Sequence, residues 1–96
     1  METFYHNGTH LSTVEIRRFG DKLHTLRTQR RMTLKELAQA LGHSAHGYIS
    51  ELEAGKKTPS VEFVLRVALL FDVTTDVLLR DELELPFSFE PDGDNA

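Results

Sequence analysis

The chain has 96 residues and no cysteine, and its 11 Lys and Arg against 15 Asp and Glu give a formal net charge of −4. This length fits a single domain, and the lack of cysteine excludes disulfides and thiolate metal sites and fits a reducing compartment. The sequence has no run of about 18 apolar residues and no basic signal-peptide start, so we expect a soluble protein that acts in the cytoplasm.

Charge is distributed unevenly along the chain. Residues 17–66 contain ten Lys and Arg and five acids, so this region is basic by five charges. Residues 81–96 contain six acids and no base. The negative net charge therefore does not exclude nucleic-acid binding, because the basic residues are concentrated in the middle of the chain.

Residues 1–15 form a polar N-terminal arm with a few aromatic side chains. Asn7-Gly8 supplies the positive φ angles of a two-residue turn, and strand-prone residues flank it, so a short hairpin is one interpretation. An unstructured arm is the other, because chain ends fray unless they are held.

The next 65 residues, 16–80, have the periodicity of consecutive helices. Apolar residues at steps of three and four predict a first helix over about 14–30, which Gly20 weakens. Thr33-Leu34-Lys35-Glu36 is a capping box that starts a second helix, and Gly42 ends it. Its buried face is predicted to contain Leu34, Leu37, Ala38 and Leu41.

Three shorter helices follow in the prediction. Ser44 is the N-cap candidate for a third helix over about 45–53, with Ile49 and Leu52 facing inward and Gly55 ending it. Ser60 caps a fourth helix over 61–71, and Thr74 or Thr75 caps a fifth that ends at Leu79. The core candidates of the fourth helix are Val64, Leu65, Val67, Ala68 and Phe71.

The last segment, 81–96, is an acidic tail that contains one alternating stretch. Leu83, Leu85, Phe87 and Phe89 occupy every second position, which predicts a half-buried strand over 83–89. Pro86 restricts this strand to an edge or to one-sided pairing.

The second and third helices, with the glycine-bearing turn between them, form the unit that carries function. Two short helices joined in this way, and held rigid by the remaining helices, are the arrangement that inserts one helix into the major groove of DNA. The chain resembles the Cro/phage-repressor-like, or XRE-type, helix-turn-helix family from about Phe19 to Leu79. The matching motifs include Thr33-Leu34-Lys35-Glu36-Leu37-Ala38, Leu41-Gly42, Tyr48-Ile49-Ser50-Glu51-Leu52-Glu53-Ala54-Gly55-Lys56 and Thr58-Pro59-Ser60. The resemblance implies a mainly α, five-helix domain.

The resemblance also implies which residues meet DNA. The third helix reads base edges through its early, outward residues, which are Ala45, His46, Gly47, Ser50 and Glu51. Phosphate contacts fall to Thr33, Lys35, Ser44, Tyr48, Lys56 and Lys57. Arg27 and Glu53 match a structural pair that orients the third helix. Ala45-His46-Gly47 replaces the usual glutamine or serine readers, so the fold is predicted more firmly than the target sequence.

These residues predict a sequence-specific transcriptional regulator, a repressor rather than an activator, that binds a palindromic operator as a homodimer. The predicted dimer residues are Val77, Leu78, Leu83, Leu85, Phe87 and Phe89. Two alternatives stay open: an antitoxin that binds a protein partner through the acidic tail and also represses its own operon, and a control protein of a restriction–modification system.

Other chemistry is not predicted. His43 and His46 lie three residues apart, as metal ligands can, but the sequence offers no third ligand nearby, so we predict no metal site. No nucleophile–base pattern and no Gly-rich phosphate loop is present, and we expect neither an enzyme nor a cofactor. Arg30-Arg31 has two interpretations of equal weight: a solvated helix end and a DNA-backbone contact.

Overall fold

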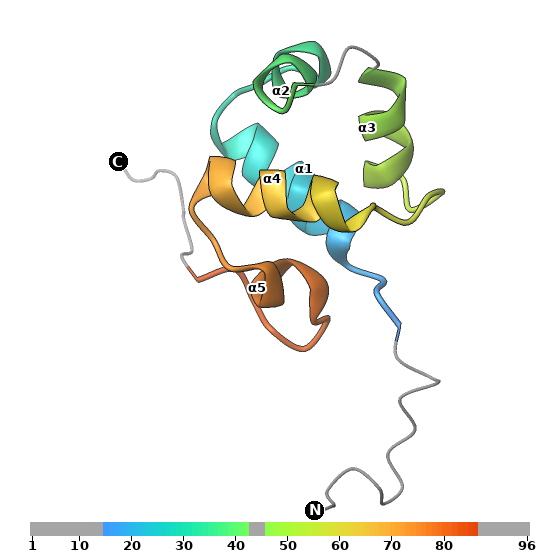
Figure 1. Cartoon of the computed structure of the whole chain (residues 1–96), viewed down its shortest axis with the longest axis vertical. Coiled ribbons are helices and arrows are strands. Elements are labelled where there is room, and N and C mark those ends of the chain that lie inside the picture. Colours follow the sequence, from blue (N-terminus) through green and yellow to red (C-terminus); the bar gives the residue numbers. More distant parts are fainter. Residues whose placement is uncertain (1–14, 43–45, 87–96) are drawn as a thin grey trace, which may run out of the picture.

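The computed structural model describes residues 15–42 and 46–86, and within these ranges the chain forms five α-helices and no β-strand. The helices are α1 (Phe19–Gln29), α2 (Leu34–Ala40), α3 (His46–Glu53), α4 (Val61–Phe71) and α5 (Thr75–Leu79). Figure 1 shows α2 and α3 at one end of the molecule and α5 at the other, with α1 and α4 crossing between them. The predicted five-helix fold is confirmed. None of the described helices is long and apolar enough to cross a membrane.

Side-chain caps place the starts of three helices at the predicted residues. The Thr33 hydroxyl accepts from the Glu36 amide at 3.0 Å, and the Glu36 carboxylate accepts from the Thr33 amide at 2.8 Å, which completes the capping box. Ser60 caps α4 and Thr74 caps α5 in the same way, each accepting from an amide at 3.1 Å. These bonds satisfy amides that have no partner within their own helix.

The first helix begins later than its sequence pattern predicts. Residues 15–18 are not helical, and α1 starts at Phe19. The Asp81 carboxylate accepts hydrogen bonds from the backbone amides of Arg17, at 2.9 and 3.0 Å, and Arg18, at 3.0 Å. These bonds hold the chain ahead of α1 against the segment after α5, so the helix begins only at the following residue.

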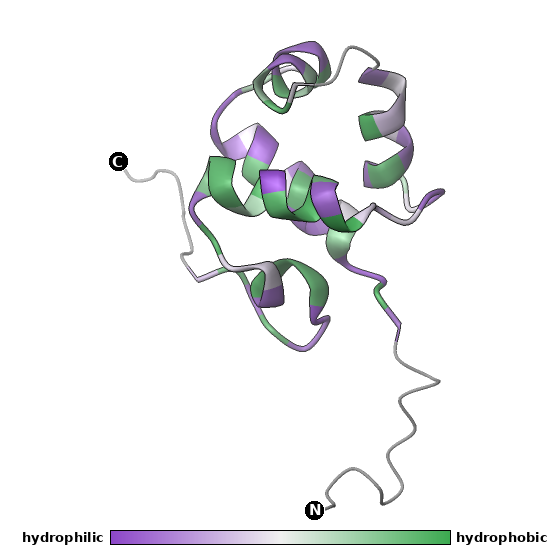
Figure 2. Cartoon of the chain, in the orientation of Figure 1, coloured by the Kyte–Doolittle hydropathy of each residue, from purple (hydrophilic) through white to green (hydrophobic). Residues whose placement is uncertain are grey.

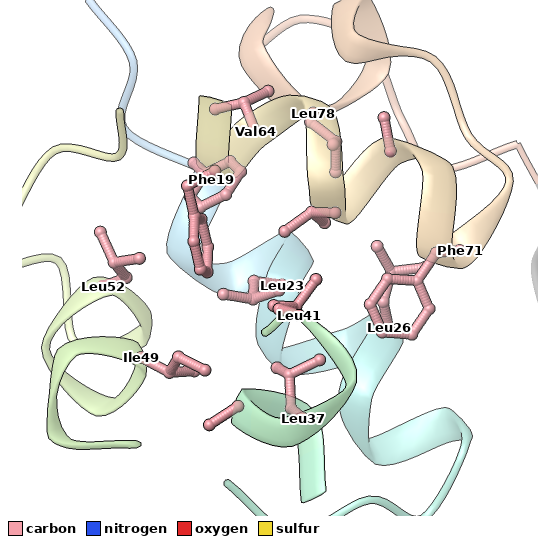
Figure 3. Packing of buried hydrophobic residues seen from close by; sticks show 14 residues of the cluster. Phe19, Leu23, Leu26, Leu37, Leu41, Ile49, Leu52, Val64, Phe71 and Leu78 are labelled. Carbon is pink, nitrogen blue, oxygen red and sulfur yellow. The ribbon is translucent and has the colours of Figure 1, made fainter. Parts of the chain in front are cut away.

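Every helix contributes to one hydrophobic core (Figure 3). Its fourteen buried members are Phe19, Leu23, Leu26, Leu37, Ala38, Leu41, Ile49, Leu52, Phe63, Val64, Val67, Ala68, Phe71 and Leu78. One prediction about this core is wrong: Leu65 is 50% exposed, because α4 turns Phe63 rather than Leu65 inward. Leu34, predicted on the buried face of the second helix, is half-buried and packs against the core.

A buried cation ties the end of α5 to α1. The side chain of Lys22 lies on α1 and is 2% exposed, and its Nζ donates to three carbonyl oxygens, those of Val77 at 2.7 Å, Arg80 at 2.9 Å and Leu83 at 2.7 Å. Burial, followed by the nearby Arg18 charge, lowers the pKa of Lys22 below its ordinary value. The three carbonyl oxygens replace water as hydrogen-bond acceptors for the ammonium group. Its positive charge is also favoured by the helix dipole at the C-terminal end of α5.

The described part of the acidic tail packs against the domain. Residues 81–86 form a turn and an irregular segment, and Leu85 lies against the core. The Arg18 guanidinium donates to the Glu84 carboxylate at 2.8 and 3.2 Å, which holds this segment beside the start of α1. The predicted strand over 83–89 is not confirmed, because residues 83–86 are not a strand and 87–89 lie outside the described residues. The N-terminal hairpin also lies outside them.

Candidate nucleic-acid interface

A glycine on α1 allows α3 to pack close to it. A Cβ atom on Gly20 would lie 2.3 Å from the carbonyl oxygen of Leu52 and 2.9 Å from that of Glu53. Both distances are shorter than any real Cβ contact, so only glycine permits this approach. The sequence shows this residue only as a weak point in a helix, whereas the tertiary structure shows that it sets the position of α3.

An ion pair holds the same end of α3. Arg27 of α1 donates from Nε and Nη2 to the two carboxylate oxygens of Glu53, at 2.7 and 3.0 Å, and its Nη1 reaches the Met32 carbonyl at 2.8 Å. His24 Nδ1 lies 2.9 Å from the same carboxylate. The structure therefore brings together the pair Arg27 and Glu53 and adds His24 to it.

The pair is largely buried, and this affects the titration of Glu53. The side chains of Arg27 and Glu53 are 13% and 9% exposed. Burial by itself would raise the pKa of Glu53, but the hydrogen bonds and charges of Arg27 and His24 outweigh it and lower that pKa below its ordinary value. The Arg27 pKa is raised by the same hydrogen bond. Glu53 thus stays ionised and keeps α3 oriented against α1.

The helix pair itself is joined by buried side chains. Leu37 and Ala38 of α2 and Ile49 and Leu52 of α3 all lie in the core. Gly42 ends the α2 segment with a φ of +77°, the left-handed conformation that favours glycine. The remaining turn residues, including Ser44 and Ala45, lie outside the described residues. These side chains therefore join α2 and α3 through one shared core.

The opposite face of α3 is turned to solvent. His46, Gly47 and Ser50 are exposed, and nothing lies within 4 Å of a Cβ built on Gly47. These are three of the five residues predicted to touch base edges. The start of α3 therefore presents an open surface.

Glu51 is the fourth described residue of this helix that was predicted to contact bases, and its side chain is paired with a cation. Its carboxylate lies 3.1 Å from Lys57 Nζ, which follows α3 in the loop. Lys57 Nζ also lies 5.9 Å from the centre of the Tyr48 ring. Tyr48 packs edge-on against Phe63 at 5.3 Å between ring centres. Tyr48 therefore lies at the edge of the exposed face, between α3 and α4, and Lys57 is the ion-pair partner of Glu51.

Lys35 and Lys56 flank the exposed face without such partners. Both are exposed, and among residues 15–42 and 46–86 neither forms an ion pair. Thr33 was also predicted to contact phosphate, but its backbone amide already donates to the Glu36 carboxylate within the capping box.

Arg30 points away from this surface. Its guanidinium lies 4.8 Å above the Phe71 ring and donates to the Leu70 carbonyl at 3.3 Å. That geometry favours a structural role for Arg30.

The predicted dimer residues are not gathered on one open surface. Leu78 is fully buried in the core of its own subunit, so the prediction that it contacts a second subunit is wrong. Val77, Leu83 and Leu85 are half-buried. Phe87 and Phe89 lie outside the described residues. Among the residues that the structure describes, the exposed large apolar side chains are instead Ile16, Val61, Leu65 and Leu69.

No cluster of three or more His, Asp or Glu that could hold a metal occurs among the described residues. Of the two histidines considered as ligands, His46 is exposed at the start of α3 and His43 lies outside the described residues.

Comparisons with known proteins agree on one architecture. The family model HTH_3, described as helix-turn-helix, matches residues 23–78. The HTH-type transcriptional activator BcrR of Enterococcus faecalis is 38% identical over 64 residues, which cover 67% of this chain and 31% of BcrR. The chain therefore spans about a third of the length of that relative.

Solved structures resemble the chain over the same region. The N-terminal DNA-binding domain of SinR from Bacillus subtilis superposes with a TM-score of 0.63 at 29% identity, covering 71% of this chain and 99% of that domain. The restriction–modification controller protein C.AhdI from Aeromonas hydrophila gives a TM-score of 0.59 at 27% identity, covering 66% and 94%.

Proposed function

The chain belongs to the HTH_3 helix-turn-helix family of DNA-binding transcriptional regulators, and from this we propose that it is a sequence-specific repressor that binds a palindromic operator as a homodimer. One observation carries the proposal. The inward face of α3 is fixed by Gly20 and by the Arg27–Glu53 pair, while its outward face is exposed and has no partner side chain at Gly47. A helix held rigidly on one side and open on the other can enter a major groove.

The roles of residues within the interface follow from exposure and charge. His46, Gly47 and Ser50 face outward from α3 and would meet base edges, together with Ala45. Lys35 and Lys56 would meet phosphates on either side, because they carry charge that no described acid neutralises. Phosphate contacts fix the register of the protein on DNA, and base contacts supply specificity.

Dimerisation would turn one short reading helix into a selective regulator. A single α3 reaches only a few base pairs, whereas two copies related by a two-fold axis read two half-sites about 34 Å apart, one helical turn of DNA. An inverted repeat in the operator would mirror the symmetry of the dimer. We propose that the protein acts in the cytoplasm and represses by blocking access of polymerase to the promoter.

The test begins with selection of bound DNA from a random pool, followed by gel shifts on the selected sequence at several salt concentrations. We expect an inverted repeat and an affinity that falls steeply with salt. Lys35→Ala and Lys56→Ala should each weaken binding to all sequences and reduce the salt slope by about one. The matched control is Arg80→Ala, since Arg80 is an exposed cation paired with Glu82 in the segment after α5.

Base-contact variants should behave differently from phosphate-contact variants. His46→Ala or Ser50→Ala should change which half-site is preferred and leave the salt slope unchanged. If all four variants shift affinity and salt slope alike, the assignment of these residues is wrong. If the selection returns no preferred sequence, the proposal of a sequence-specific regulator is wrong.

The similarity to C.AhdI favours a second candidate, the control protein of a restriction–modification system. The same helix pair would then regulate the genes of a nuclease and a methyltransferase. Genes of these two kinds beside the coding sequence, with the selected repeat in their promoter, would favour this candidate.

A further inference from the structure

The outer side of α4 carries an unpaired apolar row. Val61, Leu65 and Leu69 follow one another at intervals of four residues and are 86%, 50% and 74% exposed. Residues four apart lie on the same side of a helix, so the three side chains form one ridge about 12 Å long. Figure 2 shows α4 largely in the hydrophobic colour, interrupted by hydrophilic bands.

A groove extends this ridge toward α5. It has a volume of about 300 Å³ and is lined by Ile16, Pro59, Val61, Val64, Leu65, Thr75 and Leu79. None of these residues belongs to α2 or α3. At its far end the ridge borders α2, where Leu69 lines a hollow with Gln39 and Ala40, whereas no residue of α3 lines either hollow. A partner bound in the groove and along the ridge would therefore leave the exposed face of α3 free for DNA.

We propose that this surface, the α4 ridge with its adjoining groove, is where two copies of the chain pair. The inference rests on the proposed homodimer and names its interface. A two-fold interface uses the same patch on both subunits, so the patch must complement itself. When two α4 helices run antiparallel and cross at Leu65, Val61 of one copy faces the partner's Leu69, and the two Leu65 side chains meet at the axis.

Charge permits this pairing. The only charged residues within α4 are Glu62 and Arg66, and their side chains bind each other at 2.6 Å. Each helix therefore neutralises its own charges, and Arg66, next to the axis, comes near the partner's Arg66 with its charge already paired to Glu62.

The area of the surface indicates how tight the pairing is. A fully exposed aliphatic side chain offers on the order of 100 Å² of apolar surface. At their observed exposures, Ile16, Val61, Leu65 and Leu69 supply roughly 250 Å² from each subunit. A standard interface buries about 800 Å² per partner, so these side chains form its apolar centre and the polar surroundings supply the rest. We therefore expect a reversible dimer that dissociates in the micromolar range and is stabilised by an operator with two half-sites.

The chain contains no cysteine, which allows a direct test by single-cysteine crosslinking. Leu65→Cys places one thiol of each copy at the proposed axis, where the two Cα atoms should lie within the roughly 4.4–6.8 Å that a disulfide spans. We expect it to form a covalent dimer under mild oxidation. Val61→Cys alone places the two thiols about 12 Å apart and should not, but a mixture of Val61→Cys and Leu69→Cys proteins should crosslink.

Sedimentation measures the equilibrium without crosslinking. Leu65→Ser should weaken dimerisation at least tenfold, and Val77→Ser, the matched change on α5, should alter it less than twofold. Circular dichroism of both variants checks that the helices are retained. Leu65→Ser should still bind a single half-site as the unchanged protein does and lose the extra affinity for the full inverted repeat.

Two results would overturn the inference, and only the second would also overturn the proposed homodimer. If Leu65→Cys does not crosslink and Leu65→Ser dimerises normally, the interface lies elsewhere and the homodimer survives. If the unchanged protein is a monomer at all concentrations and on its operator, both the homodimer and this interface are wrong.

Discussion

Replacing Gly20 with alanine should destabilise the domain, although alanine is the better helix former. The new Cβ would lie 2.3 Å from the Leu52 carbonyl oxygen, and ordinary contact begins at 3.4 Å. The neighbouring atoms are backbone of α3, which cannot rotate away as a flexible side chain can. The only relief is a shift of about 1 Å between α1 and α3, by the difference of these two distances.

The size of the effect follows from two opposing contributions. Alanine in place of glycine inside a helix stabilises by about 1 kcal/mol. Overpacking a well-packed site costs about 1–3 kcal/mol, and a backbone obstacle places this site at the upper end. We expect a net loss of about 1–2 kcal/mol, which lowers the melting temperature by roughly 4–16 °C in a domain of this size.

Thermal and urea unfolding measure this loss, and Gly47→Ala is the matched control. Gly47 also lies in a helix, but nothing lies within 4 Å of the position that its Cβ would take, so the same substitution there should stabilise by up to about 1 kcal/mol. Gly20→Ala should also weaken operator binding at temperatures where the protein is folded, because α3 is displaced. Equal stability changes for the two glycine variants would refute the argument from close packing.

Three further predictions concern charged side chains. Arg27→Met leaves the Glu53 carboxylate buried without its main partner and should cost about 3 kcal/mol in urea unfolding. Because the pKa of Glu53 is lowered in the folded protein, the stabilisation by the ion pair is complete above the ordinary pKa of a glutamate. It is lost as the pH falls through the folded-state pKa. Lys57→Ala should weaken operator binding by exposing the Glu51 charge to phosphate, and adding Glu51→Gln should restore most of the affinity, as gel shifts would show. Lys22→Met removes the donor to three carbonyls and should cost about 1–3 kcal/mol in urea unfolding.

Each of these three has an outcome that contradicts it. For Arg27→Met, an acid-unfolding profile identical to that of the unchanged protein would show that the pair is not responsible for the pH dependence. For Lys57→Ala, no recovery on adding Glu51→Gln would mean that Lys57 binds phosphate directly. For Lys22→Met, unchanged stability would mean that water solvates the three carbonyls equally well.

The fold was largely predictable from the sequence, because its signals are local. The capping box at Thr33, the caps at Ser60 and Thr74 and the glycine at position 42 each act within one helical turn, so their spacing is visible in the sequence. The resemblance likewise pointed to the face of α3 that the structure leaves exposed, at His46, Gly47 and Ser50. Of the residues implied for base contact, those within the described part of α3 are exposed, except Glu51, which is half-buried and paired.

The exposed row of α4 was predicted wrongly, with Leu65 expected in the core, because helix α4 is apolar on nearly all sides. Its sequence offers two apolar rows at intervals of four, one through Val61, Leu65 and Leu69 and one through Phe63, Val67 and Phe71. Periodicity alone does not say which row faces inward. The packing of Phe63 against Phe19 and Tyr48 turns the second row into the core and leaves the first exposed.

The sequence by itself therefore determined the helices, their order and which helix we propose to read DNA. Only the tertiary structure shows which contacts fix that helix in place and which apolar side chains stay exposed. Gly20 matters only because α3 approaches it, Lys22 only because three carbonyls from the end of α5 and the segment after it surround it, and Asp81 only because it meets the amides ahead of α1. These partners are about 30–60 residues apart in the chain, and no local pattern encodes contacts over such separations.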